Sequence, residues 1–182
     1  MNYDKIKLMQ MERRDIPDLK GILNSYKIPL CEFKELNTSA LNDTYDSSLF
    51  GKDGNYNFAI RATTEGAFLS TVGFCSIKCI DWVSRHCELY FIYATDDDPA
   101  TIPNNDNAIS AFRTLIDFAF NELNLQKVWI SVPENNNIKG VLNSFGFVAE
   151  GVRRRSKLSK GDYIDETICS LLVQEYRERE IK

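Results

Sequence analysis

The stretch from Asn135 to Asp165 constrains the fold more than any other part of this 182-residue chain. Four apolar residues at helical spacing predict a short helix: Ile138, Val141, Leu142 and Phe145. Gly146 ends that helix, and two strands are predicted over residues 147–155 and 163–172, with a turn around Gly161. A helix followed directly by a hairpin predicts that the chain ends in a sheet with a helix beside it.

The remaining residues extend this sheet. Further strands are predicted over residues 6–9, 57–61, 69–80, 87–93 and 127–132, and further helices from Arg14, with Asp15 as its cap, and over residues 107–124. Aromatic residues occupy both faces of the strand at 87–93, so we expect it to be central. Residues 31–55 predict a short helix and a mobile loop, and the charged residues 175–182 predict a frayed tail. One α+β domain over residues 1–182 follows, with a mixed sheet flanked by helices.

Composition excludes several classes of function. A net charge of −4 and a pI of about 5.1 provide no footprint for nucleic acid. Five cysteines without a CxxC pair indicate free thiols, with Cys75 and Cys79 predicted to share one buried strand face. The single histidine, His86, argues against a histidine-based metal site, so no metal is expected. Neither a signal peptide nor an apolar run of about 20 residues is present, which predicts a cytoplasmic protein without membrane contact.

A set of short motifs, in a characteristic order over residues 57–176, resembles the GCN5-related N-acetyltransferase (GNAT) superfamily, especially its RimJ/RimL-type branch. The motifs are Val72-Gly73-Phe74, Glu88 to Tyr93, Phe118 to Leu125, Asn135, Gly146-Phe147, Glu150-Gly151 with Arg153, and Tyr163 with Asp165. This resemblance implies the GNAT fold: a mixed, twisted sheet whose central strands, at 87–93 and 127–132, splay apart to form a cofactor slot.

The resemblance also implies a function. Members of the family transfer acetyl from acetyl-CoA to a primary amine, here a small molecule or a protein N-terminus, and the resemblance allows a homodimer. It assigns Glu88 the role of general base. It assigns acetyl-CoA binding to Phe91, Ile92, Tyr93, Asn105, Asn107, Ala108 and Asn135. An asparagine at the position of Asn135 is equally consistent with a residue that only caps its helix.

The loop before the long helix departs from the family pattern. It reads PNNDNAIS from Pro103, without the glycines that let backbone N–H groups approach the CoA pyrophosphate. Asp106 stands at one glycine position, where like charges about 4 Å apart cost roughly 1–4 kcal/mol. Either the N–H groups of Asn105, Asn107 and Ala108 receive the phosphates in a shifted register, or the protein is a non-catalytic GNAT-fold binding module that has lost normal acetyl-CoA binding. Taken by itself, Asp106 also fits an ordinary helix cap.

The catalytic groups leave further alternatives open. Glu88 is either a base whose pKa is raised by burial near Trp82, or a solvated or paired strand carboxylate. The family's usual acids are missing, because Leu142 and Ile138 occupy the positions of its tyrosine and serine. The run Arg153-Arg154-Arg155 fits a solvated face, or contact with an acidic substrate or the CoA 3′-phosphate. We expect Trp82 and Trp129 to be packing residues and Asp165 to orient the hairpin.

Overall fold

The computed structural model describes residues 5–25, 54–63, 70–93, 106–134, 139–159 and 161–180. Within these residues a seven-stranded mixed sheet has the order β1-β2-β3-β4-β5-β7-β6. The strands are β1 (Lys5–Gln10), β2 (Tyr56–Thr63), β3 (Ser70–Asp81), β4 (His86–Tyr93), β5 (Lys127–Pro133), β6 (Val148–Ser159) and β7 (Asp162–Leu172). All neighbouring strands are antiparallel except β4 and β5, which are parallel. The predicted α+β class is confirmed.

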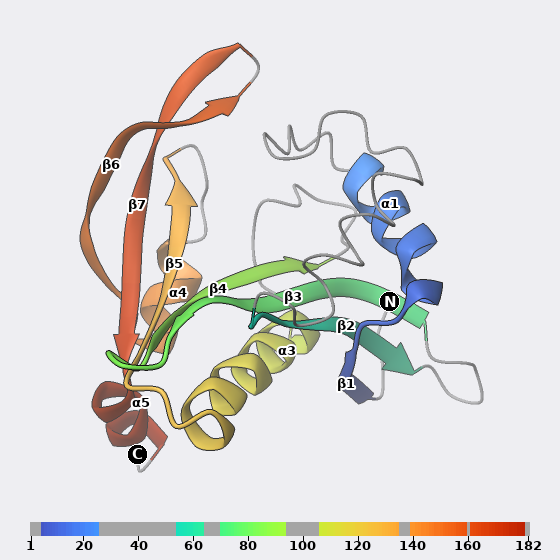
Figure 1. The fold of residues 1–182 in the computed structure, drawn as a ribbon, viewed down its shortest axis with the longest axis horizontal. Helices are drawn as coiled ribbons and strands as arrows, with labels where there is room; N and C mark the ends of the chain where they lie inside the picture. The colour runs from blue at the N-terminus through green and yellow to red at the C-terminus, as the bar shows by residue number, and fades with distance from the viewer. Residues whose placement is uncertain are drawn as a thin grey trace.

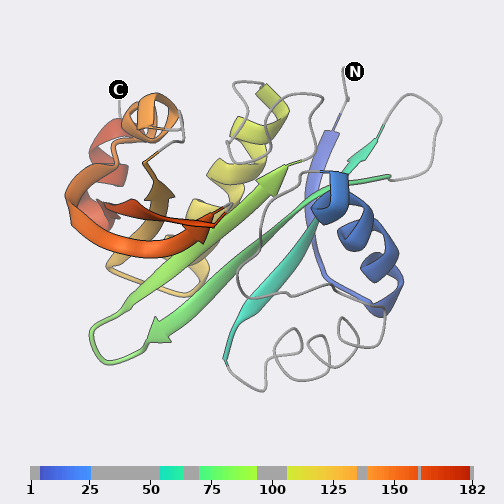
Figure 2. The same cartoon turned by 90° about the horizontal axis from the view of Figure 1, so that it is seen from above.

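Helices cover both faces of the sheet. They are the short 3₁₀ turn η1 (Arg13–Asp15), α1 (Ile16–Ser25), α3 (Asp106–Asp117), its π-helical continuation η3 (Phe118–Glu122), α4 (Lys139–Phe145) and α5 (Val173–Glu180). Figure 1 shows α3 along one face of β2, β3 and β4, with α1 on the other face, and Figure 2 shows the strong twist of the sheet. In the part of the chain described, no helix is long and apolar enough to cross a membrane.

The core lies between α3 and the central strands. Six apolar residues predict one face of α3 and η3, and four of them are fully buried: Phe112, Ile116, Ala119 and Phe120. The other two, Ile109 and Leu123, are half-buried, and Ala108, Ala111 and Leu115 are also buried. Phe112 is the centre of this face, because its ring centroid lies 5.2 Å from that of Phe91 on β4, 5.2 Å from that of Phe145 on α4, and 5.9 Å from that of Phe147. These ring contacts join α3, α4 and β4 around one cluster, which holds the two splayed strands in place.

The predicted splay of the central strands is present. β4 pairs with β3 from Glu88 to Tyr93, but with β5 only at His86↔Lys127, Cys87↔Val128 and Glu88↔Trp129. Beyond Glu88 no described strand is paired with the β5 side of β4. A parallel pair that ends after three residues leaves backbone groups along both diverging edges without ladder partners. Such a wedge can accommodate an extended ligand.

Two predictions about the β3–β4 hairpin are wrong. Cys79 is exposed with a φ of +50°, whereas Cys75 is buried, because the register shifts between Lys78 and Asp81 and resets the alternation of side chains. Trp82 is 54% exposed in the turn, so it is not the packing residue that was predicted. Burial raises the pKa of the Cys75 thiol, which fits its role as a small core residue.

At the C-terminal end the structure differs from prediction. Residues expected to fray form α5, since Val173 and Tyr176 are buried and the Tyr176 hydroxyl donates to the Asp117 carboxylate. At the other end, Asp15 acts as a cap as predicted, in a capping box with Glu12, and it is also buried. It accepts from Arg61 at 2.7 Å, and from the backbone N–H of Glu12 at 2.7 Å. The helix and loop predicted within residues 31–55 lie almost entirely outside the described residues.

Candidate active site

Glu88 lies where β4 and β5 part. It is the last β4 residue paired with β5, opposite Trp129. Its neighbours Cys87 and Leu89 point into the core against α3, so Glu88 projects from the other side of the sheet. Desolvation raises the pKa of the Glu88 carboxyl. The positive charges of Lys78 and Arg153 and a hydrogen bond from Cys79 oppose that rise, and the negative charge of Glu166 adds to it. The predicted raised pKa is present, and burial is its main cause.

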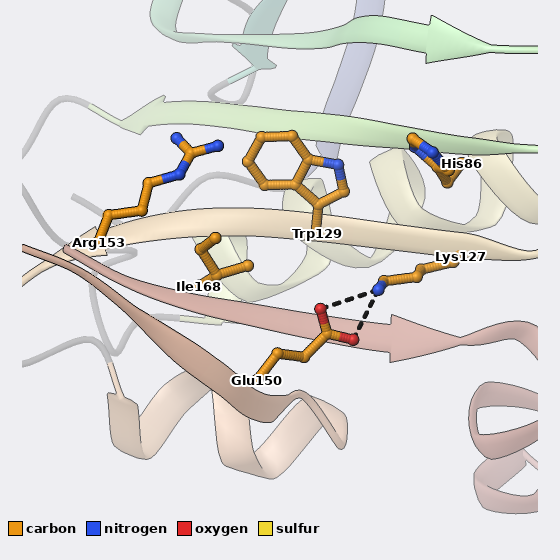
Figure 3. Close-up of a pocket in the computed structure, with 6 residues that line it drawn as sticks. All are labelled: His86, Lys127, Trp129, Glu150, Arg153 and Ile168. Carbon is orange, nitrogen blue, oxygen red and sulfur yellow. Dashed lines mark hydrogen bonds and ion pairs between the residues drawn. The ribbon is translucent and has the colours of Figure 1, made fainter. Parts of the chain in front are cut away.

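The side chains around Glu88 belong to what we call the open face, the sheet face opposite α3. Strand register puts Trp129, Ser131, Ile168 and Arg153 on it, from β5, β7 and β6. A pocket of about 270 Å³ opens there, lined by His86, Lys127, Trp129, Glu150, Arg153 and Ile168. Figure 3 shows the Trp129 ring and the Arg153 side chain directed toward β4, with Lys127 and Glu150 joined on the other side of the pocket.

One end of the pocket is electrostatically balanced. The Lys127 ammonium donates to both Glu150 carboxylate oxygens, at 2.6 and 2.8 Å, and the Ser170 hydroxyl donates to the same carboxylate at 2.7 Å. These hydrogen bonds, that from Lys127 first, lower the pKa of Glu150. Glu150 is therefore ionised and satisfied, so it is poorly suited to act as a base.

The other end of the pocket carries a cation stacked on an aromatic ring. The Arg153 guanidinium carbon lies 5.4 Å from the centroid of Trp129. Trp129 was expected to be a packing residue, and it also forms a wall of the pocket. The Arg153 side chain is exposed and borders the pocket.

The splayed end of β4 contains three residues that the resemblance assigned to cofactor binding. The Phe91 and Tyr93 rings stack at 6.5 Å on the core side, and only Ile92 lies on the open-face side. Contact with a ligand in the wedge would therefore fall mainly to their backbone. Gly73 lies opposite Tyr93 on β3, and a Cβ there would come within 2.4 Å of the Ile92 carbonyl oxygen.

The N-terminus of α3 contains three more of the residues discussed from sequence. Asp106 is the first helical residue and is exposed, Asn107 is half-buried, and the Ala108 side chain is fully buried. Asp106 thus lies in the first turn, where a carboxylate complements the helix dipole, rather than before it as a cap. Asn105 and Asn135 lie outside the described residues.

Sequence reasoning missed one polar group beside the wedge. The Ser131 hydroxyl of β5 is buried, and it makes no hydrogen bond in the described part of the chain. An unsatisfied buried hydroxyl costs about 1–3 kcal/mol, so a partner supplied by a ligand would relieve it. Strand alternation puts Ser131 two residues from Trp129 on the same face, but no local motif distinguishes it from an ordinary strand serine.

Two other expectations concern supporting residues. Asp165 orients the hairpin as predicted, because its carboxylate accepts from the Arg155 backbone N–H at 2.6 Å. Leu142 is fully buried and Ser144 donates to the Val141 carbonyl at 2.7 Å, so α4 offers no hydroxyl in place of the missing tyrosine. Within the described residues no group of three histidine, cysteine, aspartate or glutamate side chains is arranged to hold a metal ion.

The fold and the chain have recognisable relatives, although no family model matches the sequence. The uncharacterized N-acetyltransferase p20 of Bacillus licheniformis is 31% identical over 132 residues, which span 72% of this chain and 68% of that protein. The Vibrio cholerae spermidine N-acetyltransferase in complex with CoA and spermine has a TM-score of 0.79 at 22% identity, covering 94% of this chain and 98% of that one. Its dodecameric structure in an intermediate state has a TM-score of 0.77 at 20% identity, covering 96% and 97%. The similarity to p20, together with the splayed seven-stranded fold, shows that the chain belongs to the GNAT family of N-acetyltransferases.

Proposed function

We propose that this protein transfers an acetyl group from acetyl-CoA to a primary amine bound on the open face, with Glu88 as the general base. The observation that carries the proposal is the position of Glu88. Its half-buried carboxyl, with a raised pKa, projects from the last β4–β5 pair, directly beside the wedge. Membership of the N-acetyltransferase family and the CoA-bound neighbour support it.

Glu88 has to remove one proton from the acceptor ammonium, directly or through a water molecule. Its carboxylate takes that proton, and the neutral nitrogen can then attack the thioester carbon while the carbon–sulfur bond breaks. The nitrogen loses its second proton as the amide forms, and this proton neutralises the departing sulfur, so that CoA leaves as the thiol. Acetyl-CoA supplies the activated acetyl group. A raised carboxyl pKa suits this task, because general bases work best with a pKa near the working pH. We assign Ser131 of β5 as the hydroxyl that donates a hydrogen bond to the departing sulfur, because α4 offers no acid for this role.

The remaining roles concern the co-substrate. In this proposal the backbone of Phe91, Ile92 and Tyr93 lines the pantetheine arm, and Asn135 reaches the same arm. The N–H groups of Asn105, Asn107 and Ala108 receive the phosphates at the start of α3. The motif order favours the RimJ/RimL-type branch. The acceptor is then a small amine or a peptide N-terminus, and the oligomer is a homodimer.

Thermal unfolding and thiol release test the proposal together. Acetyl-CoA at 100 times its dissociation constant is expected to add about 2.7 kcal/mol of stability. A panel of amino acids, polyamines and N-terminal peptides is then assayed for release of CoA thiol. Glu88→Gln should keep the thermal shift and lose the turnover. A folded protein with neither a shift nor turnover would overturn the proposal and leave the GNAT-fold binding module.

A further inference from the structure

Arg153 lies beside the pocket, and its positive charge has no ion-pair partner among the described residues. Its guanidinium stacks on Trp129, 5.4 Å from the ring centroid, and makes no ion pair or hydrogen bond with any other described residue. A guanidinium that lies over an indole ring keeps its N–H donors available at its edges. Its planar fork of donors matches a carboxylate in two-pronged geometry.

The carboxylates that would ordinarily pair with Arg153 are engaged elsewhere. Glu166 is its cross-strand partner on β7, yet the Glu166 carboxylate accepts from the Ser156 hydroxyl at 2.6 Å. Glu150 lines the same pocket, and Lys127 and Ser170 hold it. The charge of Arg153 is therefore not neutralised by an ion pair with its nearest acids. An anion from outside the protein would complete the arrangement.

Arg153 is also close enough to Glu88 to interact with it. Both Arg153 and Lys78 favour the ionised form of the Glu88 carboxyl, so two cations surround the proposed base. A polycation that reaches Glu88 would have the cations Arg153 and Lys78 close by, as well as the carboxylates of Glu88 and Glu166. An amine that carries its own carboxylate would meet a complementary pair instead: Glu88 for the ammonium and Arg153 for the carboxylate.

We propose that Arg153 binds a carboxylate carried by the acceptor, so that the protein prefers amines bearing a nearby carboxylate over polyamines. The inference rests on the proposed function and adds the substrate class to it. The pocket volume of about 270 Å³ suits an acceptor the size of one amino acid. The carboxylate is that of a free amino acid or of an acidic side chain beside a peptide N-terminus, and the same guanidinium would bind either.

Matched acceptors test the preference. Alanine is compared with alaninamide, and a peptide amide beginning with Asp with its Asn counterpart. Within each pair one carboxylate is replaced by an amide, and rates are compared per neutral amine because this change also lowers the pKa of the acceptor amine. We expect kcat/KM to favour the carboxylate form at least about tenfold in one pair, which identifies the source. Arg153→Gln should raise KM for that form at least about tenfold and raise KM for the amide form much less, whereas the loss of a cation near Glu88 should shift the pH profile of kcat equally for both forms.

Two variants separate recognition from packing. Arg153→Lys keeps the charge without the planar fork, so it should recover part of the lost preference. Arg154→Gln removes the neighbouring exposed arginine of β6 and should change nothing. If Arg153→Gln lowers the melting temperature but leaves the acceptor preference intact, Arg153 only packs on Trp129 and the inference is wrong. Equal or greater activity with polyamines than with carboxylate acceptors in the wild type would also overturn it.

A binding assay keeps the inference testable without turnover. The chain has two tryptophans, so Trp82→Phe leaves Trp129 as the only one. Titrating the preferred acceptor class, alanine or the Asp peptide amide, should change Trp129 fluorescence, and the added Arg153→Gln change should abolish that response. A response without acetyl transfer to any amine refutes the proposed function but supports the carboxylate site. Transfer without a response refutes the site alone, and the absence of both refutes both.

Discussion

At its N-terminal end β4 is hydrogen-bonded on both sides, to β3 and to β5, whereas beyond Glu88 it keeps only β3. The paired end carries Cys87 and Leu89 in the core and Glu88 on the open face. The splayed end carries Phe91 and Tyr93 in the core, beside a wedge that α3 and α4 flank. One strand therefore contains a fully paired segment and a half-paired segment, and the proposed base lies at the boundary.

This difference separates two tasks. Pairing on both sides holds the Cα of Glu88 and so the direction of its side chain, which catalysis by a positioned base requires. Pairing on one side leaves main-chain groups along β4 available to an extended molecule, as in recognition by strand addition. Changes at the paired end should therefore alter the chemical step, and changes around the splayed end should alter co-substrate affinity or stability.

The largest effect is expected from Glu88→Gln at the paired end. The variant keeps the shape of the side chain and removes the proton acceptor, so kcat should fall by roughly 10²–10⁴-fold with acetyl-CoA affinity unchanged. Because the Glu88 pKa is raised, the wild-type rate should decline as pH falls through that pKa, and the variant should lack this limb. Steady-state kinetics over the full pH range in which the protein stays folded measure both. The exposed Glu122→Gln is the control, and unchanged kcat in Glu88→Gln would remove Glu88 from the mechanism.

Gly73→Ala tests the backbone at the splayed end. The new Cβ would lie 2.4 Å from the Ile92 carbonyl oxygen and 3.0 Å from the Tyr93 Cα, so β3 has to move away from β4. We expect a loss of about 1–3 kcal/mol in the free energy of unfolding, measured with urea, and weaker acetyl-CoA binding. Gly151→Ala on the edge strand β6, where no atom lies within 4 Å of the new Cβ, is the matched control. Equal effects in the two variants would contradict the close approach.

Asp106→Gly should improve acetyl-CoA binding at the first turn of α3. Removing a carboxylate from the first turn of α3 relieves repulsion of a diphosphate, so acetyl-CoA should bind at least about fivefold more tightly, while kcat stays the same. Isothermal titration gives the affinities. Asp18→Gly, which changes an acidic residue in the first turn of α1, controls for the lost helix-dipole interaction. Undetectable binding in both the wild type and Asp106→Gly would favour the non-catalytic alternative.

The smallest effect is expected from Ser131→Ala. Loss of one hydrogen bond to the departing sulfur should lower kcat by about 2–10-fold, without a change in acetyl-CoA affinity. Ser144→Ala removes a hydroxyl that already donates to Val141, so its kcat should match the wild type. Single-turnover rates of the two variants decide the point. If Ser131→Ala is as fast as Ser144→Ala, Ser131 has no part in the reaction.

Local patterns in the sequence determined the elements of this protein. The apolar face of α3, the alternation along β5 and the final hairpin were all predictable, because a side-chain period depends only on neighbours a few residues away. The motif order additionally predicted the splay between β4 and β5 and the central position of Glu88. The catalytic role of Glu88 and the cofactor contacts of Asn105, Asn107, Ala108 and Asn135 stay predictions.

Only the tertiary structure decided what surrounds Glu88. Trp129, Ser131 and Arg153 come to the open face from β5 and β6, and their register depends on which strands pair and where a bulge interrupts them. The bulge between Lys78 and Asp81 turned Cys79 outward against the local pattern. The charged residues at the C-terminal end likewise form α5, because the Tyr176 hydroxyl donates to Asp117, a partner far away in sequence. Contacts of this kind follow from packing between distant segments, which no local periodicity encodes.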